Sequence, residues 1–72
     1  MSSMEIKFAE RLRELMEEKN VNQTQLSEKT GIPQGRISKW MSGENYPSLE
    51  GLWKIADYFD ISLDILVGRK DY

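Results

Sequence analysis

Two short helices and a sharp turn are predicted within residues 22–43, which read NQTQLSEKTGIPQGRISKWMSG. Asn22 is a favourable N-cap, and Gln25 follows it at the spacing of a capping box, in which each side chain bonds the backbone N–H of the other residue. The first of the two helices should therefore run from about Gln23 to Lys29. Gly31 can take a positive φ without steric cost, so we expect the chain to turn there.

The second helix should follow Pro33, whose fixed φ suits a first helical turn, and should extend to about Ser42 before Gly43 ends it. Its apolar side chains, which include Ile37 and Trp40, fall on one side. The opposite side carries only small and polar residues: Gln34, Gly35, Arg36, Ser38 and Lys39. Such a face, taken alone, is most often the solvated side of an amphipathic helix.

Three more amphipathic segments flank this pair, so the sequence predicts an all-α fold of five short helices around one core. One runs from about Ile6 to Lys19, Ser48 caps another, and Ser62 caps a short last helix. We expect residues 6–68 to form the domain. Residues 1–5 should be a flexible N-terminus, and residues 69–72 a frayed C-terminal tail.

Two tryptophans need an interpretation, because an exposed aromatic ring can stack on the bases of single-stranded nucleic acid. Trp40 lies at helical spacing from Ile37, and Trp53 lies at helical spacing from Leu49. Apolar residues at such spacing usually face a core. Both tryptophans are therefore predicted to be core anchors.

The composition excludes several classes of function. The chain has 72 residues and contains no cysteine and no histidine, which excludes disulfides, structural zinc sites and triads that need histidine. The serine hydroxyls have no base partner and no glycine-rich phosphate loop occurs, so neither an enzyme, a cofactor nor a metal site is predicted. No segment approaches the roughly 20 apolar residues of a membrane span, and no secretory signal is visible. The expected location is the cytoplasm.

Charge is distributed unevenly, although the formal net charge is −2. Residues 19–43 contain four basic residues and one acidic residue, a net charge of +3. Residues 1–18 contain three basic and five acidic residues, a net charge of −2. Residues 44–72 contain three basic and six acidic residues, a net charge of −3. Binding of a polyanion depends on a local basic surface more than on total charge. The two-helix unit is the segment whose charge suits contact with phosphates.

An ordered series of motifs extends without a gap from about Arg11 to Gly68. It comprises Arg13-Glu14-Leu15, Val21-Asn22-Gln23-Thr24-Gln25-Leu26, Gly31-Ile32-Pro33-Gln34, Ile37-Ser38-Lys39-Trp40, Ser42-Gly43, Pro47-Ser48-Leu49-Glu50, Leu52, Lys54-Ile55-Ala56 and Ile61-Ser62-Leu63-Asp64. In this series, over about four-fifths of its length, the chain resembles the phage-repressor and Cro-type (XRE) helix-turn-helix family. The resemblance implies a compact five-helix bundle of the lambda-repressor-like DNA-binding type.

The resemblance also implies a transcriptional regulator, more often a repressor, that binds double-stranded DNA with the helix of about residues 33–42 in the major groove. Carried over position by position, the base-reading residues are Gln34, Arg36 and Lys39. The positions that contact the DNA backbone hold Asn22, Gln23, Ser38, Asn45 and Tyr46. For Asn22, a plain helix cap is an equally good interpretation, and the two roles are compatible. Most relatives bind as homodimers on palindromic sites.

The chain departs from the family pattern at four positions, one of which is Ser27 in place of a common Ala. Met16 and Met41 stand where relatives often have an Arg–Glu ion pair, so we expect a packed methionine contact in its place. Gly35 stands where relatives often have a base-reading side chain. Gly35 and the acidic flanks leave a second interpretation open: a protein–protein interaction module on the same fold, antitoxin-like or anti-repressor-like, without sequence-specific DNA binding.

Overall fold

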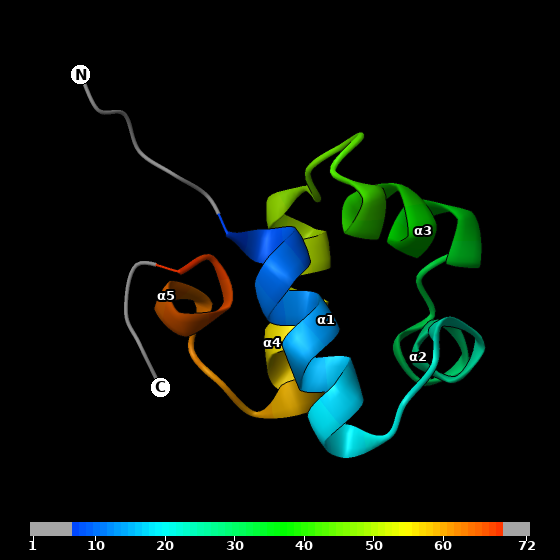
Figure 1. The fold of residues 1–72 in the computed structure, drawn as a ribbon, viewed down its shortest axis with the longest axis horizontal. Helices are drawn as coiled ribbons and strands as arrows, with labels where there is room; N and C mark the ends of the chain where they lie inside the picture. Colours follow the sequence, from blue (N-terminus) through cyan, green and yellow to red (C-terminus); the bar gives the residue numbers. More distant parts are fainter. Residues whose placement is uncertain (1–6, 69–72) are drawn as a thin grey trace.

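The computed structural model describes residues 7–68, which form five α-helices and no strand (Figure 1). The helices are α1 (Phe8–Lys19), α2 (Gln23–Thr30), α3 (Gln34–Ser42), α4 (Leu49–Phe59) and α5 (Leu63–Leu66). The predicted all-α bundle is confirmed. Figure 1 shows α2 and α3 at one end of the molecule and α5 at the other. The segments expected to be flexible or frayed, 1–5 and 69–72, lie outside the described residues.

The turn between α2 and α3 forms as its sequence predicts. The Asn22 carboxamide oxygen accepts from the Gln25 N–H at 2.8 Å, and the Gln25 side chain accepts from the Asn22 N–H at 3.0 Å. At the other end of α2, Gly31 adopts φ +78° and its N–H donates to the Ser27 carbonyl at 2.9 Å. The Ser27 hydroxyl reaches across the turn and donates to the Ile32 carbonyl at 2.6 Å. These bonds fix the angle at which α3 leaves α2.

Left-handed residues end three of the other helices. Asn20 follows α1 with φ +56°, Gly43 follows α3 with φ +82°, and Asp60 follows α4 with φ +57°. At each end, the N–H of the left-handed residue and the N–H of the residue after it donate to carbonyls of the last turn, which is the Schellman arrangement. Ser48 and Ser62 cap α4 and α5 as predicted. The chain therefore changes direction at defined points, and the short helices pack without long loops. No helix within residues 7–68 is long and apolar enough to cross a membrane.

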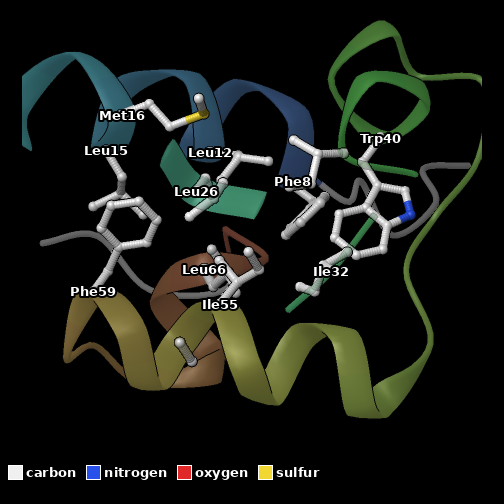
Figure 2. Close-up of a cluster of buried hydrophobic side chains, with 12 residues drawn as sticks. Phe8, Leu12, Leu15, Met16, Leu26, Ile32, Trp40, Ile55, Phe59 and Leu66 are labelled. Carbon is white, nitrogen blue, oxygen red and sulfur yellow. The ribbon is translucent and has the colours of Figure 1, made fainter. Parts of the chain in front are cut away.

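One core joins all five helices (Figure 2). It contains Phe8, Leu12, Leu15, Met16, Leu26, Ile32, Ile37, Trp40, Ile55, Ala56, Phe59 and Leu66. The Trp40 ring meets Phe8 edge to face, with ring centroids 5.9 Å apart. A Cβ added to Gly51 would lie 3.0 Å from the Trp40 ring, so glycine there lets α4 pack closely against it. Trp40 thus ties α3 to both α1 and α4.

The prediction that Trp53 is a core anchor is wrong, and Leu49, at helical spacing from it, is exposed as well. Trp53 is 59% exposed and Leu49 is 67% exposed. Successive helical residues are about 100° apart around the axis, so these two side chains point about 160° and 120° away from the fully buried Ile55. Because apolar residues encircle most of α4, the pattern alone did not indicate which arc faces inward. The outward arc of α4 consequently carries two large apolar side chains beside the charged Glu50 and Lys54.

Candidate functional site

The three residues predicted to read bases are all exposed on α3. On the opposite side of α3, Ile37 (0% exposed) and Trp40 (5%) turn inward and anchor the helix. Gln34 and Arg36 are about 200° apart around the axis and bound an outward arc, and Lys39 lies within that arc. The arc measures more than half of the helix surface, so α3 projects from the bundle and is not covered by its neighbours.

Gly35 also lies on the outward arc, and packing does not require it. A Cβ built on Gly35 meets nothing within 4 Å. Its φ is also not in the left-handed region, so an alanine would fit the free protein. The glycine leaves the helix backbone accessible between Gln34 and Arg36.

Neither Arg36 nor Lys39 takes part in an ion pair with another described residue. Both are exposed, as is Lys29 at the end of α2. The basic charge predicted for the two-helix unit is therefore free to act on an external anion.

The start of α2 offers a second set of polar groups. The capping box occupies the N–H groups of Asn22 and Gln25. The N–H groups of Gln23 and Thr24 have no acceptor among residues 7–68. They point out at the positive end of the helix dipole, which favours an anion. Asn22 is thus confirmed as a cap, and its second role, a contact with the DNA backbone, stays a prediction.

Gln23 is half-buried and is turned toward α3. Its amide Nε2 donates to the sulfur of Met41 at 3.5 Å. On the other side of Met41, Arg13 of α1 donates from Nη2 to the Met41 carbonyl at 3.2 Å. The last turn of α3 is therefore held by both preceding helices. No sequence pattern predicts the Arg13 bond, because its partners are 28 residues apart and local spacing does not relate them.

Met16 and Met41 border one surface hollow between α1, α2 and the end of α3. Met16 is buried and Met41 is half-buried. Whether the two side chains touch stays a prediction, which a double-mutant cycle can test.

In that cycle, Met16→Arg alone should lower the free energy of unfolding by about 1–3 kcal/mol, because it places a charge where the wild-type side chain is only 6% exposed. Met41→Glu alone should lower it by less. If the residues meet, the double variant should recover part of this loss, with a coupling energy of about 0.5–3 kcal/mol. Urea unfolding of the four proteins measures all the terms. Strict additivity would mean that the methionines do not meet.

The loop after α3 carries the remaining two predicted residues. The N–H groups of Glu44 and Asn45 both donate to the Lys39 carbonyl, at 3.0 and 3.4 Å, so this part of the loop is fixed to the end of α3. Asn45 is exposed, and Tyr46 is 65% exposed. Tyr46 therefore does not cover the core. Ser38 is also exposed, on the outward side of α3.

Comparisons with known proteins point in one direction. The helix-turn-helix family model matches residues 12–66. Over 66 residues, the chain is 36% identical to the HTH-type transcriptional activator BcrR of Enterococcus faecalis, covering 92% of this chain and 32% of that protein. Over 64 residues, it is 41% identical to the cryptic phage CTXphi transcriptional repressor RstR of Vibrio cholerae, covering 89% of this chain and 57% of that protein.

A solved structure of similar fold is that of a transcriptional regulator from Listeria innocua. It matches with a TM-score of 0.84 and 33% identity, over 96% of this chain and 64% of that one. The chain spans about a third of the length of BcrR and somewhat more than half of RstR.

Proposed function

The chain belongs to the helix-turn-helix family, and from this premise we propose that it is a transcriptional regulator that binds double-stranded DNA in a sequence-specific manner. The observation that carries the proposal is the projecting face of α3, on which Gln34, Arg36 and Lys39 are exposed and the two cations lack ion-pair partners among the described residues. A helix with such a face fits the major groove of B-form DNA.

Each side chain has a chemical role in this proposal. The Arg36 guanidinium can donate two parallel hydrogen bonds to guanine, and the Gln34 amide can pair with adenine. Lys39 supplies a further donor to base edges. The free N–H groups of Gln23 and Thr24 would hold one phosphate at the start of α2. Further contacts to the backbone would come from Asn22, Gln23, Ser38, Asn45 and Tyr46.

The regulator would act as a repressor in the cytoplasm by occupying a promoter and blocking polymerase. One copy of α3 reads only a few base pairs, so a homodimer on a palindromic site would supply the length that specificity needs. Selection of bound duplexes from a random pool, at two salt concentrations, tests this. A palindromic consensus is the expected result. Affinity that falls steeply with salt and yields no consensus would mean non-specific attraction only.

Replacing Gly35 with alanine should separate stability from binding. Alanine is the better helix former and meets no neighbour, so the free energy of unfolding should rise by up to about 1 kcal/mol. If the α3 backbone approaches DNA closely at this point, the added methyl group should weaken operator binding. Thermal unfolding and a DNA titration of the same sample measure both effects. Stronger or unchanged DNA binding would show that DNA does not approach the backbone there.

The second candidate is a protein–protein interaction module on the same fold. The observation that favours it is the exposed apolar arc of α4, which DNA would not attract. Acidic residues on the helices that flank α2 and α3 agree with it. Substitution of Arg36 distinguishes the two candidates.

A further inference from the structure

The outward arc of α4 is the one place where large apolar side chains gather on the surface of residues 7–68. Leu49 and Trp53, 67% and 59% exposed, are four residues apart and so lie one above the other. With Glu50 and Lys54 they line one hollow. A second hollow continues from Trp53 to Ile61 and Leu63. Single exposed apolar residues are ordinary, but adjacent Trp and Leu side chains along one helix mark an interaction surface.

The charges on this surface are complementary to those on a second copy of α4 that runs in the opposite direction. Glu50 and Lys54 form a loose pair, with Oε2 and Nζ 4.0 Å apart and side chains 80% and 46% exposed. If two copies of α4 lie antiparallel about a two-fold axis at residue 52, Glu50 of each copy faces the partner's Lys54. In that register, Leu49 and Trp53 are offset from one another by two residues, about 3 Å along the axis, which long side chains can span. Two ion pairs then flank an apolar centre.

We propose that this surface, Leu49, Glu50, Trp53 and Lys54, binds a second copy of the chain through antiparallel pairing of the α4 helices. A two-fold interface requires one surface to complement itself, and this one does so in charge. An aromatic anchor at its centre is typical of the residues that dominate binding energy. The inference deepens the proposed homodimer and rests on it for its relevance to DNA, but its test uses no DNA.

Sedimentation of the wild type and charge variants tests the pairing. Glu50→Lys leaves four positive charges facing one another, and Lys54→Glu leaves four negative charges, so each variant should dimerise at least tenfold more weakly. An equimolar mixture of the two should recover the wild-type dissociation constant, because the complementary pairs form again between unlike copies. Glu18→Lys, an exposed change of equal charge on α1, is the matched control and should leave dimerisation unchanged.

Tryptophan emission gives an independent measurement, because Trp40 is already buried and only Trp53 can lose water on association. We expect a blue shift as the concentration of the wild-type chain rises, and none for Glu50→Lys. A wild type that stays monomeric up to millimolar concentration overturns the inference, as does a mixture that stays monomeric. Emission that responds to duplex DNA but not to chain concentration would assign the surface to DNA and also overturn it. A monomer that still selects a DNA consensus would leave the proposed DNA binding intact.

Discussion

Replacing Trp40 with alanine should lower the free energy of unfolding by about 3–5 kcal/mol. The indole is 5% exposed, meets Phe8 edge to face and closes against Gly51, so its loss opens a cavity where α1, α3 and α4 meet. Domains of this size have total stabilities toward the lower end of about 5–15 kcal/mol, so most of the folded population would be lost near physiological temperature. Urea unfolding followed by circular dichroism measures the change.

Trp53→Ala provides the matched control, because the residue type and the truncation are the same and only the burial differs. At a chain concentration low enough to keep the protein monomeric, it should change stability by less than about 1 kcal/mol. Equal losses at the two positions would contradict the packing described for α4. A small loss at Trp40 would mean that α3 is not anchored through this ring.

The contrast between the two tryptophans shows which parts of the fold could be predicted from sequence. Helix ends follow from neighbouring residues, so the capping box at Asn22 and the turn at Gly31 were predicted in detail. The inward arc of α4 depends on what the other helices present to it, which no local pattern contains. Nothing in the sequence marks the end of α4, because Asp60 adopts the left-handed conformation that is more usual for Gly or Asn.

The candidate site also has features that local sequence predicts and features that it does not. Exposure of Arg36 and Lys39 was predictable, because Ile37 and Trp40 fix the rotation of α3 and leave the other side outward. The support behind α3 was not, because the bond from Arg13 to the Met41 carbonyl joins distant parts of the chain. Gln23 was predicted only as a contact for DNA, yet in the structure its amide also holds Met41.

Arg36→Ala should weaken binding to the selected operator by about 1–3 kcal/mol, roughly 5- to 150-fold, and relax the preference at one base pair in each half-site. The reason is geometric: a guanidinium makes two directed bonds to guanine, and alanine makes none. Arg36 is exposed and outside the core, so the thermal unfolding temperature should stay unchanged. Affinity measured on the consensus and on each single-base variant gives both quantities.

Arg36→Lys keeps the positive charge and removes the two parallel N–H donors of the guanidinium, so it separates attraction to phosphates from reading of bases. We expect it to retain the salt dependence of the wild type while losing most of the preference at the same base pair. If alanine and lysine instead leave a weak DNA affinity unaltered at every sequence, then the face of α3 reads no bases. That result would favour the protein-binding module, because in that case the projecting cations serve a different ligand on an otherwise intact fold.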